Sequence, residues 1–164
     1  MFSKEYFSAD IFEFLNILTK HKVKFVIVGG EAVIYYGYAR LTGDIDLFYD
    51  SSNENIENLW SALLEFWDDD IPMLKSKDEF NKKGIVIQFG LPPNRIDLMN
   101  TIDGVEFSEV WENCKIEKLD LENKQCIDIY IIGLKQLIKN KKSSGRYKDL
   151  VDLEYLTSIN NEDL

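Results

Sequence analysis

Histidine and cysteine are nearly absent from this sequence, which contains one of the former and two of the latter. Cys114 and Cys126 are too few and wrongly spaced for a zinc cluster, and we expect both to be free thiols in a reducing compartment. His21 lies between two lysines where a helix is expected to end, so a solvated position near the helix dipole suits it better than a role as a catalytic base. The sequence therefore gives little support to zinc or histidine chemistry.

Long hydrophobic runs are missing too. No apolar stretch approaches the roughly 20 residues that a membrane-spanning helix needs, and the first five residues do not have the form of a signal peptide. We therefore expect a cytoplasmic protein with no membrane partner. The net charge of −10 argues against broad nonspecific binding to nucleic acid, although a local basic patch would still allow it.

Two common nucleotide-binding motifs are also missing. The sequence has no G-x-x-x-x-G-K-[ST], which would indicate a P-loop, and no G-x-G-x-x-G, which would indicate a dinucleotide site. Material for a core is plentiful, because 45% of the residues are hydrophobic and 13% are aromatic. A chain of 164 residues suits a single domain, 1–164.

Hydrophobic periodicity and turn residues predict alternating helices and strands. Strands are expected at 23–28, 44–49, 85–89, 95–99, 115–121 and 125–130. Helices are expected from a cap at 8–10 to about 20, at 31–36, from a cap at 51–53 to 67, at 107–111, at 133–142, and from 145 or 146 to about 159. A polar turn is expected at 75–83, and a hairpin loop at 90–94 makes the 85–89 and 95–99 strands antiparallel. We predict an α/β fold with a mixed, partly antiparallel sheet flanked by helices, which closes with a helical pair at about 133–159.

The candidate chemistry begins in the strand at 44–49, which opens with Asp44 and Asp46. Because side chains alternate across a strand, both carboxylates project from one face, with Cα atoms about 6 to 7 Å apart. At that spacing both can ligate the same divalent ion or ion pair. Asp97 repeats the pattern as a carboxylate between two core residues of the 95–99 strand.

Three converging carboxylates repel one another and are tolerable chiefly with a cation present. Oxygen ligands without nearby histidine or cysteine favour Mg²⁺ or Mn²⁺ over zinc. Two such ions are the usual machinery of nucleotidyl transfer. Gly29-Gly30 suits the same chemistry, because a turn without side chains at a helix N-terminus lets backbone N–H groups approach a phosphate.

Simpler interpretations remain open for these residues. The alternative for Gly29-Gly30 is a tight turn with no phosphate contact, and the alternative for Asp97 is a simple ion pair with Arg95 or Arg40. Arg40 itself is either a triphosphate contact or a loop cation.

Basic residues in the last two helices stand out against an acidic whole. The set consists of Lys135, Lys139, Lys141, Lys142, Arg146 and Lys148. These residues either lie at a solvated helix end or contact phosphate or an RNA backbone. We take Lys139, Arg146 and Lys148 as nucleotide-binding candidates. Asp149 and Asp152 are expected to orient Arg146 and Lys148 rather than to bind metal.

The order of these motifs resembles a known group of enzymes. Gly29-Gly30, thirteen further residues, Asp44-Ile45-Asp46 and the later Arg95–Leu98 segment resemble the nucleotidyltransferase fold superfamily, which includes DNA polymerase beta and aminoglycoside nucleotidyltransferases. The segment GGEAVIYYGYARLTGDIDL and the closing GRYKDLVDLEYL are most similar to bacterial nucleotidyltransferases of the abortive-infection and toxin–antitoxin type. The resemblance covers residues 25–156.

This resemblance implies a nucleotidyltransferase-like fold and roles for particular residues. Asp44 and Asp46 would bind two metal ions, Mg²⁺ or Mn²⁺, and Asp97 would serve metal binding and activation of the acceptor hydroxyl. Gly29-Gly30 would contact the triphosphate of the NTP, with Arg40 and Thr42 close to the same site.

Two hypotheses follow for the function. The first is a nucleotidyltransferase that moves a nucleoside monophosphate from an NTP to a hydroxyl of tRNA, protein or a small molecule. The resemblance to the toxin–antitoxin type extends this hypothesis to a toxin with an antitoxin partner. The second is a catalytically silent module that binds nucleotide or a partner protein. Three retained carboxylates favour the first, because a silent descendant has no physical need for a repelling cluster.

Overall fold

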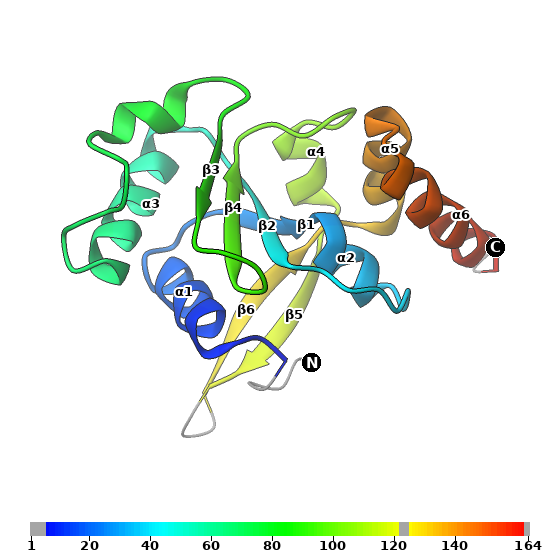
Figure 1. Ribbon diagram of the computed structural model, residues 1–164, viewed down its shortest axis with the longest axis horizontal. Helices are drawn as coiled ribbons and strands as arrows, with labels where there is room; N and C mark the ends of the chain where they lie inside the picture. Colours follow the sequence, from blue (N-terminus) through cyan, green and yellow to red (C-terminus); the bar gives the residue numbers. More distant parts are fainter. Residues whose placement is uncertain (1–5, 122–124, 163–164) are drawn as a thin grey trace.

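A six-stranded mixed sheet runs through the middle of the molecule in the computed structural model, which describes residues 6–121 and 125–162 (Figure 1). The strands lie in the order β3-β4-β2-β1-β6-β5. Neighbouring strands are antiparallel except for the pairs β2–β4 and β1–β6, which are parallel. The bounds are β1 (Phe25–Val28), β2 (Asp44–Tyr49), β3 (Val86–Phe89), β4 (Arg95–Met99), β5 (Lys115–Asp120) and β6 (Cys126–Ile131).

Helices flank this sheet and give the α/β fold that the sequence predicts. They are α1 (Ala9–Lys20), α2 (Gly29–Tyr35), α3 (Asn53–Phe66), the short 3₁₀ helix η1 (Lys77–Asn81), α4 (Phe107–Glu112), α5 (Leu134–Ser144) and α6 (Tyr147–Glu162). Figure 1 shows α1 and α3 at one end of the molecule and the pair α5 and α6 at the other. No helix in the two described ranges is long and apolar enough to cross a membrane.

Local sequence explains where several elements begin. Ser8 and Ser52 cap α1 and α3, and their side-chain oxygens accept hydrogen bonds from the N–H groups of Ile11 and Asn55 at 3.4 Å. β2 and β4 have the predicted bounds at both ends. β1 is buried along its whole length, as expected of a strand covered on both faces.

The structure also corrects other parts of the prediction. β1 begins at Phe25 rather than at residue 23, and the expected turn at 75–83 contains η1. α5 continues through Ser144 instead of ending at Lys142, because the left-handed residue that terminates it is Gly145, whose φ is +61° and whose N–H bonds to the carbonyl of Lys141 at 3.1 Å. α6 then extends to Glu162 rather than to about 159.

Sheet register determines which side chains meet at the middle of the molecule. In the parallel pair, Asp44 lies opposite Arg95 and Asp46 lies opposite Asp97. In the antiparallel pair, Gln88 of β3 lies opposite Asp97. Because residues directly opposite one another share a face of the sheet, two adjacent rows of polar side chains cross these strands.

Candidate active site

The three aspartates singled out in the sequence converge. A carboxylate oxygen of each of Asp44, Asp46 and Asp97 lies within 4.8 Å of one from the other two. Parallel pairing of β2 with β4 explains this, because it places Asp97 directly opposite Asp46. Asp44 lies two residues before Asp46 on β2 and therefore projects from the same face of the sheet. Separations of this size suit a shared divalent cation with oxygen ligands.

Asp46 lies against the glycine pair. A Cβ atom on Gly29 would lie only 1.8 Å from Asp46 Oδ2, and the φ of Gly29 is +61°, so both space and backbone conformation require glycine there. The backbone N–H of Gly30 donates to the Asp46 carboxylate. The helix α2 begins at Gly29, two residues before the start at Glu31 that the sequence predicts.

Burial and like charges act together on Asp46. Burial is the largest cause, and the neighbouring carboxylates of Asp44 and Asp97 add to it, so that the pKa of Asp46 rises to about 6 despite the opposing effects of Gly30 and Lys141. A carboxyl group in this position is easier to ionise when a cation binds beside it. The site therefore suits Mg²⁺ or Mn²⁺ by its donor atoms and by its excess of negative charge.

Asp97 is nearly enclosed by donors. Only 5% of its surface is exposed. Arg95 donates from Nε to Asp97 Oδ1 at 2.8 Å and from Nη2 to Oδ2 at 3.0 Å, and Gln88 donates from Nε2 to Oδ2 at 2.9 Å. Arg95 Nη2 also pairs with Asp44. Of the two cations that the sequence offered as partners for Asp97, the structure places Arg95 beside it and pairs Arg40 elsewhere.

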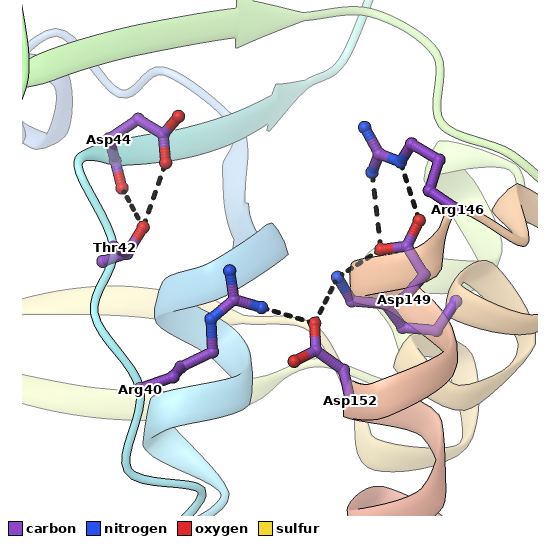
Figure 2. A network of polar contacts seen from close by, with 7 residues as sticks. Arg40, Thr42, Asp44, Arg146, Asp149 and Asp152 are labelled. Atoms are coloured by element: carbon purple, nitrogen blue, oxygen red, sulfur yellow. Dashed lines mark hydrogen bonds and ion pairs between the residues drawn. The ribbon is translucent and has the colours of Figure 1, made fainter.

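Four cations, Arg40, Lys141, Arg146 and Lys148, which we call the cationic wall, line the same cavity of about 650 Å³ as the three aspartates. Figure 2 shows how the wall is held together: Arg40 pairs with Asp152 at 2.5 Å, and Arg146 pairs with Asp149 at 2.7 Å. Lys141 lies between the two acids, 2.7 Å from Asp149 and 3.0 Å from Asp152. Both acids are almost fully buried. Hydrogen bonds from Arg146 and Lys141 outweigh burial and lower the pKa of Asp149 to about 2.

The nucleotide-binding candidates divide into two groups. Those that line the cavity are Gly29, Gly30, Arg40, Arg146 and Lys148. Two others have different surroundings. Lys139 pairs with Glu109 at 2.9 Å and does not line the cavity. Thr42 Oγ1 lies 3.0 Å from both the carbonyl oxygen and Oδ1 of Asp44, so this hydroxyl orients a carboxylate of the triad (Figure 2).

Lys141 belongs to the basic set of the last two helices, but the sequence does not single it out as a nucleotide-binding residue. It is only 4% exposed and lines the cavity. Its position gives the signal that identifies it: Leu134, Leu137 and Lys141 follow the helical period, so a lysine falls on the buried face of α5. The partners expected for Asp152 also need correction, because this acid holds Arg40 and Lys141 rather than Lys148.

Comparison with known proteins places the chain in a family. Residues 8–164 match the family model described as "Nucleotidyltransferase of unknown function (DUF6036)". No curated protein matches the chain. The match supports the nucleotidyltransferase part of the resemblance, whereas the abortive-infection type remains a prediction. Since the model matches almost the whole sequence, the protein belongs to this nucleotidyltransferase family.

Proposed function

We propose that the protein transfers a nucleoside monophosphate from an NTP to an acceptor hydroxyl, with a divalent metal ion as cofactor. The observation that carries this proposal is the convergence of three carboxylates in a cavity that Arg40, Lys141, Arg146 and Lys148 also line. The carboxylates supply the oxygen ligands of a divalent ion, and the cations supply partners for phosphate groups.

The cationic wall would hold the triphosphate. Arg40, Lys141 and Arg146 are positioned by buried acids, and Lys148 lines the same wall. Charge developing on the β- and γ-phosphates during transfer is stabilised best by cations that are already fixed in place. The pyrophosphate would therefore leave toward α5 and α6.

Asp97 would act on the acceptor. The acceptor oxygen forms a new bond to the α-phosphorus, the bond from that phosphorus to the bridging oxygen breaks, and its electron pair leaves with pyrophosphate. Asp97 accepts the proton of the hydroxyl. For this, Asp97 must exchange one of its present donors for the acceptor.

Asp44, Asp46 and Asp97 would together hold Mg²⁺ or Mn²⁺, two ions in the arrangement implied by the resemblance. Ions bound there offset the negative charge of the phosphates and stabilise the attacking and leaving oxygens. The acceptor would be tRNA, another RNA, a protein or a small molecule. A role as a toxin with an antitoxin partner is the further prediction that the resemblance carries.

Transfer of label tests this proposal. The protein is incubated with each of the four NTPs labelled in the α-phosphate, with Mg²⁺ and with total cell RNA or total cell protein. We expect label in one acceptor fraction with wild type and with Asp120→Ala, which removes an exposed carboxylate on β5 at the far edge of the sheet. Asp97→Ala is expected to lower labelling at least about a hundredfold, as for the loss of a general base. Equal labelling by Asp97→Ala would contradict the assignment.

Calorimetry separates this enzyme from a silent binding module. A nucleotidyltransferase should bind NTP more tightly with Mg²⁺ than with EDTA, and Asp44→Asn should reduce that difference. Tight NTP binding that needs no Mg²⁺ and is unchanged in Asp44→Asn would favour the module.

A further inference from the structure

Arg95 lies where a divalent ion would be expected. It is two residues before Asp97 on β4 and directly opposite Asp44 on β2, so its side chain projects from the same face of the sheet as the carboxylates. Its guanidinium bonds to both oxygens of Asp97 and pairs with Asp44. A single cation thus bridges two of the three aspartates.

Building on the proposed function, we propose that Arg95 is a displaceable occupant of the metal site: it holds Asp44 and Asp97 together in the free protein, must leave when a divalent ion binds, and then pairs with the triphosphate. The free protein would consequently bind metal weakly, and nucleotide would strengthen that binding.

Hydrogen-bond capacity explains why Arg95 and an ion compete. A carboxylate oxygen has two lone pairs. Asp97 Oδ2 already accepts from Gln88 and from Arg95, and Asp97 Oδ1 accepts from Arg95 Nε. Mg²⁺ requires ligand oxygens at about 2.0 to 2.1 Å, and a guanidinium on the same oxygens would place two positive groups within a few ångströms of each other. Such a like-charge contact is strongly unfavourable away from bulk water.

The cavity provides Arg95 with another partner. Arg95 lines the cavity together with Arg40, Lys141 and Arg146, and 28% of its side chain is exposed, so its outer part has access to that space. Besides the three aspartates, Asp103 and Asp149 line the cavity, and Asp149 already pairs with Lys141 and Arg146. Without nucleotide, a displaced guanidinium would therefore lie mainly among other cations. A bound triphosphate would give it phosphate oxygens that match its planar donors. Displacement is therefore favourable chiefly when nucleotide is present.

Binding of Mn²⁺ in the absence of nucleotide tests the proposal. Calorimetric titration compares wild type with Arg95→Gln, which removes the bridging charge, and with Arg146→Gln, which removes a cation from the same cavity. Arg146 is a matched control because its charge also acts on Asp46, while its hydrogen bonds go to Asp149. We expect Arg95→Gln to bind Mn²⁺ about tenfold or more tightly than wild type, the change that corresponds to one or two charge-assisted hydrogen bonds. Arg146→Gln should change the affinity by less than about threefold.

A second measurement follows the coupling to nucleotide. The affinity for a non-hydrolysable NTP analogue is measured with saturating Mn²⁺ and again with EDTA. The ratio of the two affinities should be several times larger in wild type than in Arg95→Gln, because linkage makes the effect of metal on nucleotide equal to that of nucleotide on metal.

The outcomes are distinct. Equal Mn²⁺ affinities in wild type and Arg95→Gln would overturn the role of Arg95 and leave the proposed function standing. Mn²⁺ binding that is tightened equally in Arg95→Gln and Arg146→Gln would also overturn the role of Arg95, because the loss of any nearby positive charge would then explain the change. Failure of all three proteins to bind Mn²⁺, with or without the analogue, would overturn this proposal together with the metal-dependent function. Arg95→Lys, which keeps the charge but loses the bridging donors, should give an intermediate affinity.

Discussion

At the scale of single residues, the site is built at some cost to the stability of the free protein. Asp46 has a pKa raised to about 6, because it is buried beside two other carboxylates. Between about pH 4 and pH 6 the folded protein therefore binds more protons than the unfolded chain. Stability falls as the pH rises through this window, and the loss remains above it. The same repulsion favours a cation, so the stability deficit and the readiness to bind metal have one cause.

This argument predicts the effect of Asp46→Asn on stability. At pH 8 with EDTA the variant should be more stable than wild type by about 3 kcal/mol, from a pKa shift of about 2 units at about 1.4 kcal/mol each. At pH 4, where Asp46 is protonated in the folded protein and about half ionised in the unfolded chain, the difference should fall to about 0.5 kcal/mol. Urea unfolding at both pH values measures it. Asp120→Asn, an exposed change on β5, is the control and should stay within about 0.5 kcal/mol of wild type. A variant no more stable than wild type at pH 8 would contradict the argument.

At the scale of elements, the start of α2 and the start of β2 depend on each other. Gly29 is in the left-handed region, and its Cα faces the carboxylate of Asp46 without room for a side chain. The pairing of β1 with β2 fixes this contact, because Val28 lies opposite Asp46. The glycine pair therefore positions Asp46, one of the three carboxylates proposed to hold the metal ion.

Gly29→Ala tests this coupling, with Gly84→Ala as a matched control. Gly84 also has a positive φ, +79°, but a Cβ there would come no closer than 3.9 Å to Thr101 Oγ1. Gly84→Ala should cost only the backbone strain, about 1 to 2 kcal/mol. Gly29→Ala must also move the Asp46 carboxylate, so it should cost at least about 1 kcal/mol more and lower Mn²⁺ affinity, whereas Gly84→Ala should leave that affinity unchanged. Urea unfolding and calorimetric titration measure the two effects, and equal results for the two variants would contradict the coupling.

Local patterns in the sequence predict most of these elements but not their long-range partners. Alternation and caps predict the bounds of β2 and β4 and the starts of α1 and α3, and the hairpin loop predicts the pairing of β3 with β4. The parallel pairing of β2 with β4, which brings Asp97 beside Asp46, has no such local signal. Pairing between distant side chains has no local signature. Arg40 and Asp152 are 112 positions apart, and Lys139 and Lys141 differ only in which face of α5 they occupy. Because the two lysines lie two positions apart on the helix, Lys139 pairs with Glu109, whereas Lys141 lines the cavity.

At the scale of the whole molecule, charge is separated along its length. The segment 133–150 contains six lysines and arginines against one aspartate, in a protein whose net charge is −10. In Figure 1 this segment, which includes α5 and the first turn of α6, lies at one end of the molecule. By its charge, an NTP would be repelled by most of the protein and attracted by this segment. Because such fields act over about 10 Å at 0.1 M salt, the cationic wall would dominate close to the cavity and would steer nucleotide toward it.

Joint binding of metal and nucleotide should therefore stabilise the whole fold. A ligand at a hundred times its Kd that binds only the folded state adds about 2.7 kcal/mol. For a domain of this size that corresponds to a rise in Tm of about 5 to 11 °C. Thermal melting with a non-hydrolysable NTP analogue should show this rise with Mg²⁺ and a much smaller one with EDTA, because without a divalent ion Arg95 stays paired with Asp44 and Asp97 and the triphosphate faces three carboxylates. Asp44→Asn should lose most of the Mg²⁺-dependent part, while Asp120→Asn should keep it. A rise of equal size in EDTA would mean that the cationic wall binds nucleotide alone, and the carboxylates would then need another explanation.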